Sequence, residues 1–444
     1  MESYQTKKTK NGLRLLVVKR PKNPQLIHFQ FMVGIGSDLE SGRQLEIGHF
    51  LEHLFVSLTS NKHPDSKANR ELFSRNNINY SASIGTKNTV YEYSFRKTKL
   101  DLFLDLFVNG ILDYKVDKKI FKSEKSSIIE ELHEIIDDIA YHLETYTDEM
   151  LYRGHHRTVS QKTRLANTLK MTPSQIQNYW EKYYRIPYSV VAVYGSLDIG
   201  VLVKKIEAIA KKIKVKQAIF EPLNKLALTD IYMPYKQKNE SKILFSRKHD
   251  NITTLKLSWR INMNIFSRDY YKIYALDFIL INDLNSLLLR KLRTEKGLIY
   301  DIESFFSIDE LQGDLSFYTF QTTVSSKKLM QVLTAFMEVI DYLTKNRIKE
   351  ENFKKFVETQ RQLILDRNES MDFSHTLTTY ARSYLWGKNI LTQEAEDKHF
   401  VDVNRDEIFK VSRNIFQTNN LYISYTSPNN VNKEIEKLLD SQDF

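Results

Sequence analysis

Two histidines and a glutamate lie close together in residues 49–53, which read His-Phe-Leu-Glu-His. On a helix, His49 and His53 would project from one face, because residues four apart are neighbours there. Two imidazoles spaced this way can bind one zinc ion at about 2.0–2.1 Å each. Glu52 would then reach the open coordination position and take a proton from a water whose pKa zinc has lowered. The segment therefore predicts a catalytic zinc centre; the alternative is a helix with two surface histidines.

A catalytic zinc ion also needs a third protein ligand. Candidates lie in the acidic helix expected over 117–151, where Glu124 and Glu131 are seven residues apart and share one face. Neighbouring isoleucines indicate that this face is partly buried. Glu130 lies about 100° round the helix from Glu131 and would point elsewhere. These residues leave Glu124 and Glu131 open as the third ligand.

The elements that must position these residues fall into two similar halves. The first half predicts strands at 13–18, 27–33, 78–83, 89–95 and 189–194 and helices at 47–58, 98–113, 117–151 and 199–213, with a further helix that starts at Pro173 after Thr172. The second predicts strands at 253–261, 299–307, 314–323 and 421–425 and helices at 268–293, 326–345 and 349–384. The repeated order predicts a duplicated unit, and antiparallel strand pairs beside long helices favour an α+β fold. We place domains at 1–215 and 241–444, joined by a linker at 216–240 that contains two prolines.

Composition argues against several other classes of protein. The 444 residues include no cysteine, which excludes a disulfide framework, a thiolate nucleophile and a Cys-bound zinc ion. The net charge is +10, but the basic clusters are short and scattered, so we expect no nucleic-acid partner. No apolar run approaches the roughly 18 residues of a membrane span, and the N-terminus lacks the apolar core of a secretory signal. We therefore expect no membrane insertion and a cytoplasmic location.

Residues 48–55 resemble the zinc motif of the pitrilysin family, whose His-x-x-Glu-His order is the inverse of the commoner one. This family includes insulysin and the shorter mitochondrial processing peptidases, and the resemblance covers nearly the whole chain. It implies that His49, His53 and Glu131 bind one zinc ion per chain and that Glu52 is the catalytic base. Glu124, the first glutamate of the family's Glu-x6-Glu pattern, would be a supporting carboxylate of the catalytic site.

The same resemblance implies a surface for a peptide substrate. Residues 81–91 are similar to a family hairpin whose edge strand pairs with extended substrate, which assigns backbone contacts to Ala82 and Ser83. Ser81 stands where the family has asparagine, which affects that side-chain contact but not the backbone pairing. Residues 288–300 are similar to a segment whose arginine and tyrosine reach the substrate, which assigns these roles to Arg293 and Tyr300. Without the resemblance, these two would be a helix-end cation and a strand aromatic.

Together these observations predict a zinc metalloendopeptidase that cleaves peptides or short unfolded segments. In the family, two α/β sandwich domains with mostly antiparallel sheets form a half-clamshell, and two halves enclose a chamber. A homodimer, or a heterodimer with a homologous subunit, is therefore expected, and processing of a bacterial peptide precursor would suit it. The alternative from another class is a non-catalytic partner subunit with a scaffold or binding role. A zinc hydrolase that acts on a non-peptide amide is a third reading, which the predicted edge strand disfavours.

Overall fold

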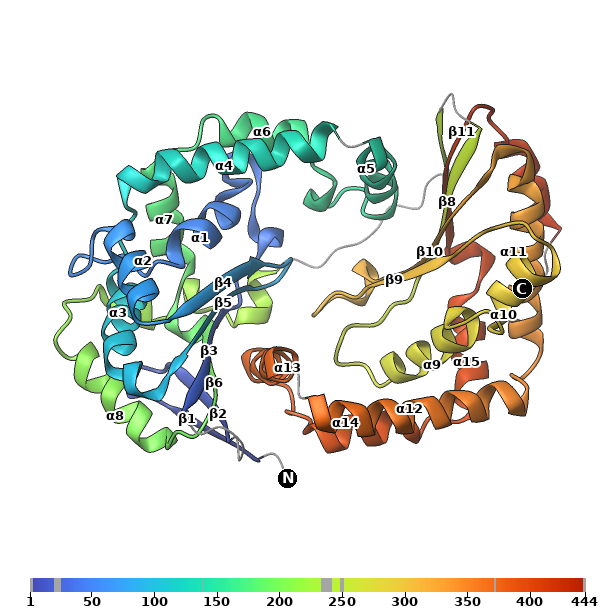
Figure 1. Cartoon of the computed structure of the whole chain (residues 1–444). Coiled ribbons are helices and arrows are strands. Elements are labelled where there is room, and N and C mark those ends of the chain that lie inside the picture. Colours follow the sequence, from blue (N-terminus) through green and yellow to red (C-terminus); the bar gives the residue numbers. More distant parts are fainter. Residues whose placement is uncertain are drawn as a thin grey trace. The chain divides into compact units, whose positions relative to one another are not determined.

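The chain forms two sheets flanked by helices, as a computed structural model describes it (Figure 1). It divides into two compact units that interleave along the sequence: unit 1 comprises residues 1–137, 159–233 and 371–393, and unit 2 comprises 138–158, 234–370 and 394–444. The residues that the structure describes are 3–19, 25–137, 139–232, 242–247, 251–370 and 373–441. Within these ranges, no helix is both long and apolar enough to cross a membrane.

The sheet of unit 1 has six strands in the spatial order β1-β2-β6-β3-β5-β4. Only β2 and β6 run parallel, whereas the other neighbours are antiparallel. Every residue of β6 is buried, as its unbroken apolar run predicts for a central strand. The strands are β1 (Ser3–Lys8), β2 (Arg14–Lys19), β3 (Leu26–Val33), β4 (Asn79–Ile84), β5 (Thr89–Arg96) and β6 (Ser189–Tyr194).

An aromatic core joins this sheet to its helices. The ring of Phe29 on β3 packs edge-on against Phe103 at 4.9 Å and Phe107 at 4.7 Å, both on α3. Phe55, at the end of α1, packs against Tyr91 of β5 at 4.7 Å. The helices of unit 1 within residues 1–137 and 159–233 are α1 (Ile47–Phe55), α2 (Ser66–Arg75), α3 (Leu100–Asp113), α4 (Lys118–Asp137), α6 (Gln161–Thr168), α7 (Pro173–Tyr183) and α8 (Ile199–Ala210). Of these, α2 and α6 are not among the elements expected from the sequence.

The sheet of unit 2 repeats the topology of unit 1 without its first strand. Its order is β7-β11-β8-β10-β9, and only β7 and β11 run parallel. This is the order β2-β6-β3-β5-β4 of unit 1, so the predicted duplication is confirmed. The strands are β7 (Ile243–Arg247), β8 (Ile252–Arg260), β9 (Glu303–Ser307), β10 (Phe317–Ser325) and β11 (Leu421–Ser427), with helices α9 (Asp269–Ile281), α11 (Leu329–Lys345), α14 (Gln393–Val401), α15 (Arg405–Ile415) and α16 (Asn432–Asp440).

The two units exchange one helix each, which corrects two predictions. The helix expected over 117–151 is instead α4, in unit 1, and α5 (Ile139–Leu151), which packs on β11 and β7 of unit 2. The helix expected over 349–384 is α12 (Glu350–Ser370), in unit 2, and α13 (Phe373–Leu385), which packs on β6 and β3 of unit 1. Neither stretch contains glycine or proline near the break, so the helical periodicity carries no signal to stop.

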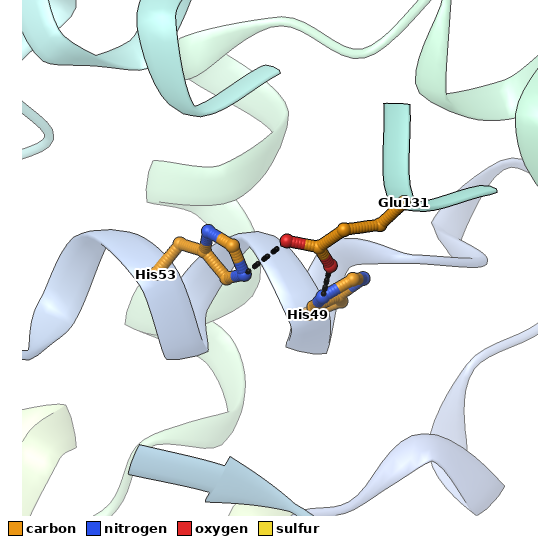
Figure 2. A group of neighbouring side chains, drawn as sticks. All are labelled: His49, His53 and Glu131. Carbon is orange, nitrogen blue, oxygen red and sulfur yellow. Dashed lines mark ion pairs between the residues drawn. The ribbon is translucent and has the colours of Figure 1, made fainter. Parts of the chain in front are cut away.

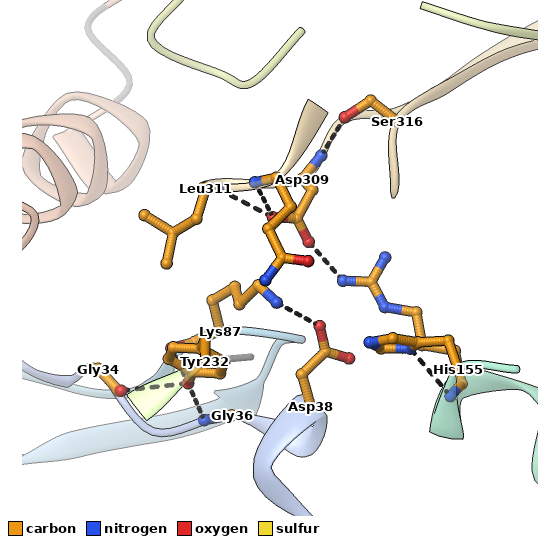
Figure 3. Close-up of polar contacts among 11 residues, drawn as sticks. Gly34, Gly36, Asp38, Lys87, His155, Tyr232, Asp309, Leu311 and Ser316 are labelled. Carbon is orange, nitrogen blue, oxygen red and sulfur yellow. Dashed lines mark hydrogen bonds and ion pairs between the residues drawn. The ribbon is translucent and has the colours of Figure 1, made fainter. Parts of the chain in front are cut away.

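The segment predicted as a linker partly packs into unit 1. Residues 216–232 of it are described there, whereas 233–240 lie outside the described residues. Tyr232 is buried, and its hydroxyl bonds the carbonyls of Gly34 and Lys87 and the N–H of Gly36 (Figure 3). Lys87 also pairs with Asp38 at 2.7 Å, with each side chain only 1% exposed. These contacts attach the loop after β3 to the β4–β5 turn.

The corresponding turn of unit 2, between β9 and β10, has its own polar support. The Asp309 carboxylate accepts hydrogen bonds from the N–H groups of Leu311 and Gln312 at 2.8 Å each. The N–H of Asp309 donates to the Ser316 hydroxyl at 2.9 Å (Figure 3). Asp309 also pairs with Arg157, which follows the exchanged helix α5. The turn and the exchanged segment of unit 2 are therefore bonded to each other.

Candidate metal centre

Helix α1 separates an apolar face from a face that carries His49, Glu52 and His53. The other residues of the helix that pack into unit 1 are fully buried, whereas these three are half-buried. The helical period of 3.6 residues therefore places these three polar side chains together on the accessible side of the helix. The ring of Phe50 stacks on Phe121 of α4 at 5.4 Å, which holds the two helices together.

Glu131 of α4 lies beside both histidines (Figure 2). Its Oε2 is 3.2 Å from Nε2 of His49, and its Oε1 is 3.8 Å from Nε2 of His53. One ligand atom from each of the three residues lies within 4.8 Å of the others. Bonds of about 2.0–2.2 Å to one tetrahedral ion would set such atoms about 3.3–3.6 Å apart. The three side chains therefore fit a zinc ion with little rearrangement.

The other nitrogen of each imidazole contacts a second carboxylate. His53 Nδ1 lies 3.0 Å from Glu124 Oε2, and Arg70 of α2 lies 3.0 Å from the other oxygen of Glu124. His49 Nδ1 lies 3.0 Å from Glu46 Oε2, and Arg164 of α6 lies 2.7 Å from the other oxygen of Glu46. An Nδ1–H that donates to a carboxylate leaves Nε2 as the lone pair for a metal ion. In this tautomer, both histidines can offer Nε2 to a metal ion.

The pKa values of these carboxylates follow from their partners. Burial alone would raise the pKa of Glu46, but its contacts with His49 and Arg164 outweigh burial, so this pKa lies below its ordinary value. The pKa of Glu124 is likewise lowered, because His53 and Arg70 outweigh burial. Burial would lower the pKa of His49, yet the contact with Glu46 raises it overall. A metal ion and a proton therefore compete for the same nitrogen of His49.

A third buried glutamate holds the start of α1. Glu40 is 1% exposed, and its carboxylate accepts hydrogen bonds from the N–H groups of Glu46 at 2.8 Å and Gly48 at 2.6 Å. These are among the donors that a helix N-terminus leaves unpaired. A Cβ on Gly48 would lie 2.2 Å from Ile84 Cδ1 and 2.7 Å from Glu40 Oε1, so glycine allows this close packing. Burial raises the pKa of Glu40 to about 7 despite the two backbone donors.

Glu52, which lies between the two histidines in the sequence, has a half-buried side chain. Its carboxylate has no hydrogen bond or ion pair with any residue that the structure describes. Burial raises its pKa, and the nearby Glu131 adds to this, whereas His49 and His53 oppose it. A carboxylate with a raised pKa and no fixed partner can accept a proton from a water beside it.

Two sequence models cover most of the chain. One, described as insulinase (peptidase family M16), matches residues 17–172, and one described as the inactive domain of that peptidase family matches residues 170–359. The chain belongs to the insulinase family of peptidases. The three clustered side chains lie within the first match, whereas Arg293 and Tyr300 lie within the second.

Two similar proteins match most of the chain, and a solved structure shares its fold. An uncharacterized zinc protease of Rickettsia felis is 21% identical over 94% of this chain and 96% of its own. The uncharacterized zinc protease YmxG of Bacillus subtilis is 23% identical over 81% of this chain and 84% of its own. The crystal structure of a protease from Helicobacter pylori has the same fold, with a TM-score of 0.79 and 17% identity over 96% of this chain and all of that one.

The predicted substrate strand lies beside the insulinase motif. Ala82 and Ser83 belong to β4, the edge of the unit 1 sheet, and pair on their inner side with Tyr91 and Val90 of β5. Helix α1 packs against this edge strand. Among the described residues, no strand pairs with the outer side of β4. Its backbone groups are therefore placed for an added strand.

The other two predicted substrate residues meet within unit 2. The guanidinium of Arg293 lies 4.6 Å from the ring centre of Tyr300, and Tyr300 is 79% exposed. The helix expected over 268–293 ends at residue 281, and Arg293 lies in a separate π-helical segment, Arg290–Glu295. Such segments occur frequently at functional sites.

Four residues around the centre are absent from the sequence-based prediction: Glu40, Glu46, Arg70 and Arg164. Arg70 lies on α2, which Asp65 begins by accepting the N–H of Ala68 at 2.9 Å. An Asp before a helix-forming stretch is a start signal, so α2 could have been predicted. By contrast, Arg164 is 118 residues from Glu46, and no local pattern links them.

Proposed function

We propose that the chain is a zinc-dependent endopeptidase with one zinc ion per chain, held by His49, His53 and Glu131. The observation that carries this proposal is the cluster of their ligand atoms within 4.8 Å. It is supported by the second carboxylate at each imidazole, which favours the tautomer that a metal ligand needs. The names of the Rickettsia and Bacillus relatives agree with a zinc protease.

The chain's own residues would divide the work of peptide hydrolysis. A peptide adds to the outer edge of β4 by backbone hydrogen bonds with Ala82 and Ser83. Glu52 takes the proton of the attacking water and passes it to the departing amine. Zinc, when bound, polarises the scissile carbonyl and lowers the pKa of that water. Glu124 keeps His53 oriented through its contact with Nδ1.

We assign substrate binding in unit 2 to Arg293 and Tyr300. The two side chains touch each other, and the Tyr300 ring is largely in solvent. Their N–H and O–H groups can donate to the carbonyl oxygens of an extended peptide or to a developing oxyanion. This role predicts an effect on peptide turnover without an effect on zinc content.

The proposal also concerns the chain's partner and its substrates. We propose that the chain pairs with a second copy or with a homologous subunit, so that peptides and short unfolded segments, but not folded domains, are cleaved. A bacterial peptide precursor in the cytoplasm would be a suitable substrate. Light scattering of the purified chain should give the mass of a dimer if it pairs with itself, whereas a monomer would indicate a missing homologous partner.

A non-catalytic partner subunit is the second candidate. The description of the model matched at residues 170–359 as an inactive domain favours it. The complete set of His49, His53, Glu131 and Glu52 in unit 1 favours catalysis, because a binding subunit has no need of them. The two candidates differ in what Glu52 does.

The test is zinc content and cleavage of a quenched peptide library for the wild type and Glu52→Gln. We expect about one zinc ion per chain in both proteins, with cleavage lost only in the variant, because Glu52 accepts the proton but does not bind the metal. Glu130→Gln, on the exposed face of α4, is the matched control and should cleave normally. A wild type without zinc, or an active Glu52→Gln, would refute the proposal.

A further inference from the structure

We propose that Glu46 is a positioning residue of the metal centre: it fixes the tautomer and orientation of His49, and the strained backbone at residue 46 is retained for that contact. This inference rests on the proposed zinc site. Glu46 lies outside the His-x-x-Glu-His motif, and nothing in the motif itself requires a carboxylate at this position.

The backbone of Glu46 has a conformation that disfavours side chains. Its φ is 77° and its ψ is −1°, in the left-handed region where glycine is the usual residue. Its N–H donates to Glu40, and its carbonyl accepts the N–H of Phe50 at 3.0 Å. Both backbone bonds would be available to glycine as well. The presence of glutamate therefore needs a reason in its side chain.

The side chain of Glu46 supplies such a reason. It is only 7% exposed, and its two oxygens lie 3.0 Å from His49 Nδ1 and 2.7 Å from Arg164 Nη1. The contact with Arg164 holds the carboxylate in place, and its other oxygen is positioned to accept a hydrogen bond from the Nδ1–H of His49. The Nε2 of His49 is then an acceptor, and this atom is the one that lies 3.2 Å from Glu131.

The left-handed backbone is part of this geometry. Glu46 precedes His49 by three residues, at the position where the chain enters α1. The conformation there sets the direction of the side chain as well as the start of the helix. His53 has a similar partner in Glu124, but that carboxylate comes from α4 and needs no strained backbone. Only the first histidine of the motif depends on the entry to its own helix.

The experiment compares Glu46→Gly and Glu46→Gln with the wild type. Glu46→Gly removes the carboxylate and relieves the left-handed strain, but it also leaves Arg164 without its ion-pair partner, so we expect a lower melting temperature of the metal-free protein, because strain relief offsets only part of that loss. We expect its zinc affinity, measured by competition with a chelator, to fall about 10–100-fold. The absorption spectrum of the cobalt-substituted protein should change as well. Glu46→Gln keeps one acceptor oxygen for His49, so its zinc affinity should lie between that of the wild type and that of Glu46→Gly.

Lys225→Gly is the matched control for backbone strain. Lys225 is exposed in unit 1 and has a φ of 61°, but it has no contact with the centre. It should raise the melting temperature slightly through strain relief alone and leave zinc affinity unchanged. Wild-type zinc affinity in Glu46→Gly would overturn the positioning role while leaving the zinc site intact. A wild type that binds no zinc would overturn the proposed function as well, so the two failures are distinguishable.

Discussion

Units 1 and 2 share five strands in the same order, yet among the residues that the structure describes only unit 1 carries the candidate metal centre. In unit 1, the helix that follows the third strand of the shared order is α1, with His49, Glu52 and His53 on its accessible face. In unit 2, the corresponding helix is α9, which contains no histidine or glutamate and is mostly buried. The comparison shows that topology places a helix at this position, whereas the side chains on it determine the chemistry.

The exchanged helices show what the two units keep in common. Each is attached to the sheet it covers by a threonine hydroxyl: Thr378 of α13 accepts from Gln30 at 2.7 Å in unit 1, and Thr147 of α5 bonds Ser424 at 2.7 Å in unit 2. Buried polar groups of this kind need partners, because unpaired ones cost about 1–3 kcal/mol each. In each unit the exchanged helix thus has a polar contact with the sheet that it covers, although the two contacts are made to non-equivalent strands, β3 and β11.

The largest expected effect comes from the residue that completes the centre in unit 1. Glu131→Gln should lower zinc content and reduce peptide cleavage roughly 10³-fold, equivalent to about 4 kcal/mol of barrier, because a catalytic zinc ion needs three protein ligands. Metal analysis and cleavage assays measure both. Glu134→Gln, on the exposed side of the same helix, is the control. Equal losses in both variants would contradict a specific role for Glu131.

A buried acid in each unit should make stability depend on pH in different windows. The pKa of Glu40 in unit 1 is raised to about 7, and that of Asp148 in unit 2 is raised to about 6. Each folded carboxyl binds its proton more tightly than the unfolded one, so stability is highest below the unfolded pKa and declines as pH rises through the folded pKa. Between pH 5 and 7, Glu40→Gln should remove a decline of about 1–3 kcal/mol in the free energy of unfolding.

Denaturant unfolding of wild type and Glu40→Gln at several pH values checks this expectation. Asp148→Asn serves as the counterpart in unit 2 and should remove the decline between about pH 4 and 6 instead. An unchanged pH profile in Glu40→Gln would show that Glu40 is not protonated in the folded chain at neutral pH.

Alanine at one tight glycine of each unit separates stability from metal binding. A Cβ on Gly48 would meet Ile84 and Glu40, and a Cβ on Gly313 would lie 2.6 Å from the backbone of Asn262. Both substitutions should destabilise their unit by about 1–3 kcal/mol. Only Gly48→Ala should also weaken zinc binding, because Glu40 must move from the start of α1. Thermal unfolding and chelator competition measure the two effects, and equal zinc affinity in both variants would contradict this coupling.

The smallest expected effect tests what unit 2 contributes. Arg293→Ala should lower kcat/KM for a peptide about tenfold, or about 1.4 kcal/mol, with zinc content unchanged. Arg290→Ala is the control, since Arg290 lies in the same π-helical segment and pairs with Glu295 at 3.5 Å. Steady-state kinetics of the wild type, Arg293→Ala and Arg290→Ala measure this effect. Wild-type kinetics in Arg293→Ala would leave unit 2 without an assigned role in substrate binding.

Much of the fold follows from local patterns. The apolar run at β6 and the alternating patterns of β5 and β10 predicted strands close to their observed positions. The repeated order of elements predicted the duplication. The limits of α4 and α12 could not be predicted, because helical periodicity continues past both and only packing on the other unit's sheet separates α5 and α13 from them. Local sequence cannot encode which sheet a helix will cover.

For the candidate metal centre too, one part follows from local sequence and another only from the tertiary structure. The spacing of His49 and His53 determined by itself that two imidazoles share one face of a helix, because that geometry is set within one turn. The residues left Glu124 and Glu131 as alternatives, and only the tertiary structure decided how carboxylates meet the imidazoles: Glu131 lies at Nε2 of both, with Glu124 and Glu46 at the two Nδ1 atoms. The supporting arginines come from α2 and α6, far away in sequence. Contacts between elements depend on how the helices pack, and no local pattern records that.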